Sequence, residues 1–187
     1  MRIIAGKYRG RNLKSPPSLE VRPTSDRLRE TLFNVISPRI EGVRFLDLCA
    51  GSGAVGIEAL SRGASQVTFI DKSRKMCALV EANLDLCCVP EDQTQVVQAD
   101  AADYLSRSLK QNAAPWNIVF FDPPYATNYL QVLELLAKTT GKLLAEDGII
   151  VVEHHHKNGL PDDLGSIIRN RILKQGDSAL SFFSTKR

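Results

Sequence analysis

The sequence predicts an α/β fold in which helices cover a mostly parallel sheet of seven strands. From residue 43 onward, short apolar runs alternate with stretches of helical spacing, a pattern typical of parallel strands joined by helices. Several runs are apolar at successive positions, as expected for strands buried on both faces. The chain has 187 residues, of which 43% are hydrophobic and 24% charged. These values are typical of one soluble globular domain and exclude disordered and fibrous proteins.

The first 40 residues predict a separate N-terminal extension. Two short segments, Ile3–Ala5 and Arg11–Leu13, are spaced to pair as a hairpin around two glycines. The proline-containing stretch Ser15–Ser18 then interrupts the pattern. We therefore predict a small basic extension over residues 1–40 and a main domain over residues 41–187.

A helix closes this extension. Thr24 is suited to cap its N-terminus, and Asp26 lies in the first turn, where the helix dipole favours a carboxylate. Pro38 ends the helical pattern. The apolar residues that recur at helical spacing are Leu28, Leu32, Val35 and Ile36.

Basic residues are concentrated in the extension, which carries no acid before Glu20. Such a cluster favours contact with nucleic-acid phosphates, because each neutralised phosphate releases counterions. A solvated edge hairpin whose charges prevent aggregation would show the same pattern, so the charge alone leaves both interpretations open. The candidate RNA-binding residues are Arg2, Lys7, Arg9, Arg11, Arg22, Arg27 and Arg29.

Seven apolar runs after residue 42 are candidate strands. They are Val43–Leu48, Val67–Ile70, Gln95–Val97, Ile118–Phe121, Ile149–Val152, Ile167–Leu173 and Leu180–Phe183. The candidate helices are Gly56–Arg62, Arg74–Leu86 with Ser73 as its cap, Ala101–Lys110 and Tyr129–Thr139. No long helix separates the last two strands, and Gln175–Asp177 is a turn signal. These strands are therefore expected to close the sheet as an antiparallel hairpin.

The sequence also argues against a membrane-spanning or secreted protein. No apolar run approaches the roughly 20 residues that span a bilayer, and the N-terminus lacks the apolar stretch of a signal peptide. The four cysteines form neither a C-x-x-C pair nor a disulfide spacing. We expect a reduced, cytoplasmic protein, by default a monomer, without membrane contact.

Three consecutive histidines, His154–His156, have the side chains of metal ligands. Successive strand residues point to opposite faces, so they are not expected to converge on one ion. We interpret them as a solvated strand end and expect no bound metal.

A glycine-rich motif directly follows the first strand of the main domain. Gly51, Gly53 and Gly56 fit the pattern G-x-G-x-x-G, and Asp71 lies about 20 residues beyond the first glycine. Glycines allow the backbone to approach a ligand, and a carboxylate at the end of the second strand can accept ribose hydroxyls. The motif predicts a nucleoside-containing cofactor without showing which one.

Two further acids narrow the choice. Asp47 precedes the glycine turn, where a carboxylate disfavours a pyrophosphate but suits an ammonium or sulfonium group. S-adenosylmethionine carries both cationic groups and no phosphate. Alternatively, Asp47 accepts hydrogen bonds from the N–H groups of the turn itself. Asp100 is placed either to accept from an adenine amine or to cap the helix that begins at Ala101, and the two roles are compatible.

A second motif, Asp122-Pro123-Pro124-Tyr125, ends the fourth strand. Consecutive prolines lack backbone donors, so the carbonyl groups there face outward without competing N–H groups. Asp122 and the Pro123 carbonyl can accept the hydrogens of an exocyclic amine, and Tyr125 offers an aromatic face to the ring beside it. The alternative is a rigid turn with Tyr125 packed on the core.

Together these residues resemble a class I S-adenosylmethionine-dependent methyltransferase, and the D-P-P-Y element is similar to that of enzymes that methylate amino groups of nucleic-acid bases. Over almost its whole length the chain resembles the RsmD-type methyltransferases. The segments that carry this narrower resemblance are Arg2–Gly6, Arg9–Gly10, Arg22–Arg27, Arg29–Glu30, Gly56–Ala64 and Gly176–Phe182. The chain departs from the family at Cys49, where we expect a larger aromatic residue, and at Gln175, where tyrosine is common.

The resemblance implies a Rossmann-like class I methyltransferase fold with one C-terminal antiparallel strand. It also implies transfer of a methyl group from S-adenosylmethionine to the N2 amine of a guanine in 16S ribosomal RNA of the small ribosomal subunit. The implied cofactor-binding residues are Asp47, Ala50, Gly51, Ser52, Gly53, Asp71, Lys72, Asp100 and Ala101. The implied catalytic residues are Asp122, Pro123, Pro124 and Tyr125, which would hold the flipped guanine. The basic extension would bind rRNA phosphates, with a second role in closing over the cofactor.

We expect direct in-line transfer, in which Asp122 and Pro123 orient the amine and Asp122 is a candidate base. Proximity contributes about 7–11 kcal/mol in well-oriented systems, so no covalent intermediate is needed. An adenine-N6 methyltransferase would use the same D-P-P-Y element. A nicotinamide-dependent oxidoreductase would explain only the glycines and Asp71, and a non-catalytic RNA-binding protein only the basic extension.

Overall fold

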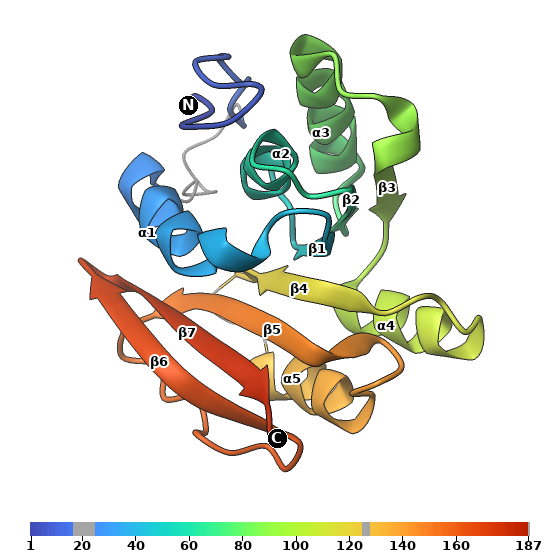
Figure 1. The fold of residues 1–187 in the computed structure, drawn as a ribbon, viewed down its shortest axis with the longest axis vertical. Coiled ribbons are helices and arrows are strands. Elements are labelled where there is room, and N and C mark those ends of the chain that lie inside the picture. Colours follow the sequence, from blue (N-terminus) through green and yellow to red (C-terminus); the bar gives the residue numbers. More distant parts are fainter. Residues whose placement is uncertain (17–24, 125–127, 187) are drawn as a thin grey trace. The chain divides into compact units, whose positions relative to one another are not determined.

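The computed structural model describes residues 1–16, 25–124 and 128–186 (Figure 1). The chain forms two compact units, Met1–Ala99 and Asp100–Arg187. The predicted boundary at residue 40 separates an RNA-facing extension from the methyltransferase domain and is not a boundary between compact units. It stays a prediction.

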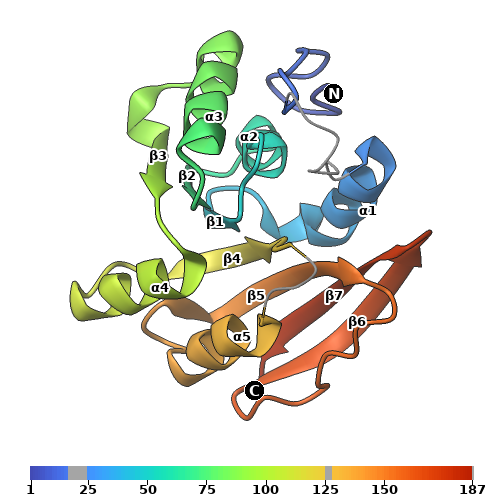
Figure 2. The ribbon, with the colours of Figure 1, turned by 180° about the vertical axis from the view of Figure 1, so that it is seen from behind.

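The first unit contains three parallel strands in the order β3-β2-β1. Its elements are α1 (Asp26–Ile36), the 3-10 turn η1 (Ser37–Arg39), β1 (Arg44–Leu48), α2 (Ala54–Ser61), β2 (Gln66–Asp71), α3 (Arg74–Cys87), the 3-10 turn η2 (Glu91–Gln93) and β3 (Thr94–Gln98). Helix α2 packs on β1 and β2, and α3 packs on β2 and β3 (Figure 2). The carboxyl ends of the three strands therefore share one edge, where the glycine motif and Asp71 lie.

The N-terminal residues pair as predicted, but over a shorter length than a strand. Arg2 and Asn12 form one antiparallel bridge, and the Ile3 and Gly10 amides donate to the Arg11 and Ile3 carbonyls at 3.0 and 2.9 Å. We call residues 1–16 the arm. Ile3, Tyr8 and Leu13 of the arm are buried.

The boundaries of two helices differ from the prediction. Ser25 caps α1 by accepting from the Leu28 amide at 3.1 Å, whereas the predicted cap, Thr24, lies outside the described residues. Helix α2 begins two residues earlier than predicted, because Gly53 has φ +76° and ends the turn at its N-cap.

The second unit contains four strands in the order β4-β5-β7-β6. Its elements are α4 (Ala101–Lys110), β4 (Trp116–Phe121), α5 (Tyr129–Lys138), β5 (Leu144–His155), β6 (Ile167–Gln175) and β7 (Ser178–Thr185). Strand β4 pairs with β5 in parallel, and β7 runs antiparallel to both β5 and β6. The seven predicted strands are all present, and β7 is the antiparallel one.

Strand β5 is much longer than predicted. Its first residue, Leu144, pairs with Trp116, and its last, His155, pairs with Ser178 of β7. The predicted strand, Ile149–Val152, lies in the middle of β5. Among the residues that the structure describes, no helix is long and apolar enough to cross a membrane.

Candidate active site

The glycine loop, residues 49–53, joins β1 to α2 and is fixed by two carboxylates of the first unit. Asp47 is 1% exposed, and its Oδ2 accepts from the Gly56 amide at 2.9 Å. Asp71 Oδ2 accepts from the Gly51 amide at 2.9 Å, and its Oδ1 accepts from Ser73 at 2.8 Å. The two acids therefore bind one N–H group within the loop, at Gly51, and one just after it, at Gly56.

Asp47 accepts from Gly56, the third residue of α2, rather than from the N–H groups of the glycine turn itself. A carboxylate offers about four acceptor positions, so one bond to Gly56 leaves capacity for a ligand. Burial raises the pKa of Asp47 to about 7; the Gly56 N–H lowers the pKa, and the negative charge of Asp71 raises it. A cationic group beside Asp47 would favour its ionised form. Two neighbouring carboxyl groups at this loop therefore favour a cationic ligand over an anionic one.

Two glycines show why the loop cannot carry larger side chains. Gly53 has a positive φ, and a Cβ there would lie 3.1 Å from Val80 Cγ1. A Cβ on Gly56 would lie 2.2 Å from a Phe69 ring atom. The third glycine of the motif thus permits close packing of α2 on β2.

The other predicted cofactor residues of the first unit surround this loop. Ala50 is half-buried, and its amide donates to the Ile70 carbonyl at 2.9 Å. Ser52 is buried, and Lys72 is exposed directly after Asp71. Their contact with a cofactor stays a prediction.

Asp100 begins the second unit as the N-cap of α4. Its Oδ1 accepts from the amides of Ala102 and Asp103 at 2.9 and 3.4 Å. The capping role is therefore confirmed. Asp100 is exposed and Ala101 is buried, and their predicted contact with adenine is not tested by this geometry.

The second motif follows the last residue of β4. Asp122 is half-buried, Pro123 is buried and Pro124 is exposed, whereas Tyr125 lies outside the described residues. The turn thus begins at the carboxyl end of β4, and its side chains range from buried to exposed.

Aromatic rings and a buried histidine support this turn from the core. Phe121 meets the Tyr129 ring edge-on at 6.0 Å, and Tyr129 meets His154 at 6.4 Å. His154 Nε2 lies 2.8 Å from Ser181 Oγ. The chain of contacts ties the end of β4 through α5 to β5 and β7.

The prediction of a solvated histidine segment is wrong for His154, which is fully buried. Burial lowers its pKa, so the neutral ring is favoured. The rings of His155 and His156 stack at 4.7 Å, and the buried His154 does not join them, so the three histidines do not converge on one point, as predicted. Strand β5 ends at His155, so the alternation of side chains ends there.

His155, His156 and Asp177 each place one donor atom within 4.8 Å of the others. The Nδ1 of His155 already accepts from the Lys157 amide at 3.2 Å, and that of His156 donates to the Asp177 carbonyl at 3.2 Å. In a neutral ring, an accepting Nδ1 leaves the proton on Nε2. A cation could bind His155 only after a change of tautomer, so we assign no metal to this cluster.

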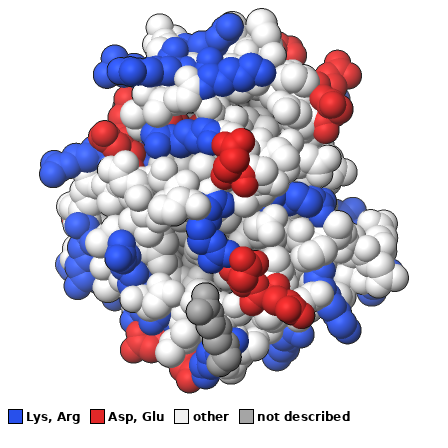
Figure 3. All heavy atoms as spheres, viewed as in Figure 1, with Lys and Arg blue, Asp and Glu red and all other residues white. Residues whose placement is uncertain are grey.

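Lysine and arginine side chains gather at the top of Figure 3, where Figure 1 places the arm. The exposed candidates of the RNA-binding set are Arg2, Lys7, Arg9, Arg11 and Arg27, and Arg22 lies outside the described residues. Arg11 Nη1 also donates to the Leu86 carbonyl at 2.8 Å, which holds the arm against α3.

Arg29 differs from the other arginines because its side chain is 0% exposed. Its Nη2 donates to the Arg2 carbonyl and to Asp26 Oδ1, and its Nε lies 3.6 Å from Glu58. Such a side chain cannot reach phosphate without leaving these partners. We therefore omit Arg29 from the proposed RNA surface and assign it to fixing the arm on α1 and α2.

Sequence reasoning missed the residues that hold the arm. Glu58 of α2 is fully buried and accepts from the Ile4 and Ala5 amides at 2.7 and 3.0 Å. Ser61 Oγ accepts from the Tyr8 amide at 2.9 Å, and Asn83 of α3 bonds the backbone of Lys14. A lone acid in the otherwise apolar start of α2 was the one available signal.

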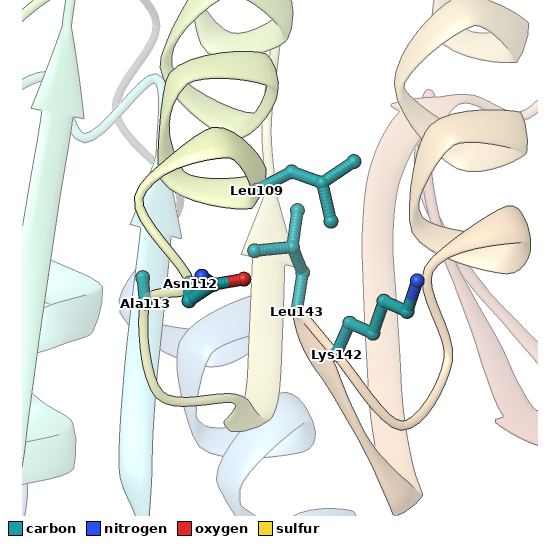
Figure 4. A pocket seen from close by; sticks show the side chains of 5 residues that line it. All are labelled: Leu109, Asn112, Ala113, Lys142 and Leu143. Carbon is teal, nitrogen blue, oxygen red and sulfur yellow. The ribbon is translucent and has the colours of Figure 1, made fainter.

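A small hollow of about 170 Å³ lies elsewhere in the second unit (Figure 4). It is lined by Leu109, Asn112, Ala113, Lys142 and Leu143. These residues precede β4 and β5, so the hollow lies at the amino ends of the strands, away from the Asp122 turn.

Comparison with known proteins identifies the family. The model of the family described as "Conserved hypothetical protein 95" matches residues 1–184. "Ribosomal RNA small subunit methyltransferase D" of Escherichia coli is 42% identical over 161 residues, which cover 86% of this chain and 78% of that protein. The chain belongs to the RsmD-type methyltransferase family. "Putative rRNA methyltransferase YlbH" of Bacillus subtilis is 36% identical and covers both chains fully.

A solved structure shows the family fold over the whole chain. "Putative methyltransferase yhhF from Escherichia coli" aligns with a TM-score of 0.85 and 36% identity, covering 100% of this chain and 98% of that one. The predicted Rossmann-like methyltransferase fold is therefore confirmed, as is the prediction that the protein is a methyltransferase.

Proposed function

We propose that the protein transfers a methyl group from S-adenosylmethionine to the N2 amine of a guanine in 16S rRNA of the small ribosomal subunit. The rRNA substrate is supported by the names of the RsmD-type relatives. The chemistry is supported by the two carboxylates at the glycine loop and by the turn that begins at Asp122.

The observation that carries the choice of cofactor is the burial of Asp47 beside the negative charge of Asp71. This pair disfavours the pyrophosphate of a dinucleotide and favours a cationic ligand. S-adenosylmethionine fits because its methionine half is cationic, and it would supply an electrophilic methyl group on sulfur. Asp47 and the loop amides would hold that half, and Asp71 retains acceptor capacity for ribose hydroxyls.

The Asp122 turn would orient the acceptor amine. A guanine N2 amine is a poor nucleophile because its lone pair is delocalised into the ring. Asp122 and the Pro123 carbonyl would accept its two hydrogens and aim the lone pair at the methyl group. Asp122 would then take the proton that nitrogen loses, as a general base. Tyr125 would stack on the base.

The proposal is tested by transfer of tritiated methyl from S-adenosylmethionine to small ribosomal subunits from a strain that lacks this gene. We expect label in N2-methylguanosine of 16S rRNA and none in duplex DNA. Label in N6-methyladenine would keep the cofactor and overturn the guanine assignment. The Asp122→Ala variant should lose at least about a hundredfold in turnover, since general acid–base catalysis alone contributes 10²–10⁴-fold. Near-normal turnover with unchanged cofactor binding would refute the role of Asp122.

A further inference from the structure

Asn83 makes contacts that the proposed chemistry leaves unexplained. It lies on α3 and is fully buried, and both N–H groups of its side-chain amide donate hydrogen bonds. Its Oδ1 accepts from the Lys14 amide at 2.8 Å. Its Nδ2 donates to the Lys14 carbonyl at 3.1 Å and to the Ser52 carbonyl at 2.9 Å. One side chain therefore joins the end of the arm to the glycine loop.

Further contacts also connect the arm to this loop. Ser52 Oγ lies 3.9 Å from Met1 Sδ at the beginning of the arm. Glu58 and Ser61, which bind the arm backbone, lie on α2, the helix that the loop opens. The arm is thus bound to α2, which follows the loop, to α3, and to the loop itself.

The arm also carries most of the exposed cations of the RNA-binding set, from Arg2 to Arg11. Lys14, the residue whose backbone Asn83 binds, is exposed and basic as well. A polyanion bound along the arm would restrict the motion of the same backbone that Asn83 connects to Ser52. If RNA binding orders the arm, cofactor binding at the glycine loop would then lose less conformational entropy, and the reverse also holds.

We propose that Asn83 is a positioning residue that couples rRNA binding on the arm to cofactor binding at the glycine loop. This inference rests on the proposed function, which supplies the two ligands. Because coupling between binding sites is reciprocal, each ligand tightens the other by the same factor. The arm then contributes to cofactor binding as well as to RNA binding.

The coupling is measured as the dissociation constant of S-adenosylhomocysteine, by equilibrium dialysis, with and without saturating small subunits from the deletion strain. This product analogue avoids turnover. For the natural chain we expect binding to be at least about fivefold tighter with the subunits, the lower end of usual couplings. In Asn83→Ala the factor should fall to about one, and S-adenosylhomocysteine alone should bind about tenfold more weakly. A factor of one in the natural chain, or an unchanged factor in Asn83→Ala, would overturn the proposal.

Two further variants separate positioning from general damage. Asn83→Asp keeps the acceptor for the Lys14 amide and removes the donors to the Lys14 and Ser52 carbonyls, so it should also abolish the coupling. Asp85→Asn, on the exposed face of the same helix, should leave the factor unchanged. In steady state, Asn83→Ala should raise KM for S-adenosylmethionine at saturating subunits while kcat changes less than about twofold. A fall in kcat alone would contradict a positioning role.

A measurement on the natural chain keeps the inference testable if the variants fold poorly. Hydrogen exchange at the Ile4, Tyr8 and Lys14 amides should slow when S-adenosylhomocysteine binds, although the ligand is expected at the loop. Unchanged exchange there would refute the coupling. If the chain methylates no subunits but the arm amides still respond to S-adenosylhomocysteine, the proposed rRNA function fails while the connection through Asn83 stands.

Discussion

The interiors of the two units use buried polar groups in different ways. In Met1–Ala99, Asp47, Glu58 and Arg29 are buried ionisable side chains, and each bonds the backbone outside its own helix or strand. In Asp100–Arg187, the buried Glu153 and His154 lie on β5 and bond serine side chains of the paired strand β7, Ser178 and Ser181. The buried polar groups of the first unit thus hold a loop and an arm, whereas those of the second join two strands of a sheet. Substitutions of the first group should therefore release the loop or the arm, and substitution of His154 should have a smaller effect.

Removing Glu58 should have the largest effect. Glu58→Ala removes one of the carboxylates beside the buried Arg29 and leaves two arm amides without acceptors, so we expect a loss of about 3–5 kcal/mol in the free energy of unfolding. Urea unfolding measures it. The control is Glu134→Ala, which breaks an exposed pair with Lys138 and should cost less than about 1 kcal/mol. Equal losses in both variants would show that the burial of Glu58 and its bonds to the arm add nothing to stability.

The pH dependence of stability should reveal Asp47. Its native pKa of about 7 lies above the ordinary value of 3.8, so its contribution is fully present below pH 3.8 and is lost as the pH rises through 7. At about 1.4 kcal/mol for each pKa unit, the natural chain should lose about 3 kcal/mol relative to Asp47→Asn between pH 5 and 8. Unfolding of both chains in urea at the two pH values is the measurement. Parallel curves would show that Asp47 titrates normally.

Substitutions at Gly6 and Gly10 should distinguish the effect of close contact with Ser61 from the effect of backbone strain. A Cβ there would lie 1.7 Å from the Ser61 carbonyl oxygen, at φ +81°. Gly6→Ala should therefore release the arm and speed tryptic cleavage after Lys7 and Arg9 by about tenfold or more. Gly10→Ala is the matched control, because its φ is +83° with nothing within 4 Å. The control should show only the cost of strain, about 1–2 kcal/mol. Similar cleavage of both variants would mean that contact with Ser61 does not hold the arm.

His154 should give the smallest effect, and one of opposite sign to that of Asp47. Burial lowers its pKa, so its contribution is present above the ordinary value of 6.5 and is lost as the pH falls through the native pKa. Between pH 7.5 and 5.5 the natural chain should lose about 1 kcal/mol at most relative to His154→Gln, as followed by thermal unfolding. Parallel unfolding of the two chains over this pH range would contradict the lowered pKa of His154.

The features that local sequence determines were predictable. The order strand, glycine turn, helix and acidic strand end lies within residues 44–71, so the spacing of Asp47, Gly51 and Asp71 sufficed to place them around one loop. The N-caps Ser73 and Asp100 were predictable for the same reason, since a cap bonds amides two or three residues away.

The features that sequence missed depend on distant partners. Glu58 and Asn83 bind amides 54 and 69 residues away, and no local pattern marks such pairs. Arg29 looked like its exposed neighbour Arg27, but the helix turns it toward Glu58. His154 looked like part of a polar strand end because the pairing of β5 with β7, which buries it, is set by the fold.

The pKa of Asp47 has a consequence for calorimetry. At pH 7 about half of the unliganded molecules carry a proton on this carboxyl, and a cation beside it would expel that proton into the buffer. The heat of cofactor binding should then include the ionisation enthalpy of whichever buffer is present. Titrations in phosphate and in Tris would differ by about half of the gap between the two buffer enthalpies. One buried side chain would thus make the apparent enthalpy of binding depend on the solvent, while the affinity rises as the medium becomes more alkaline.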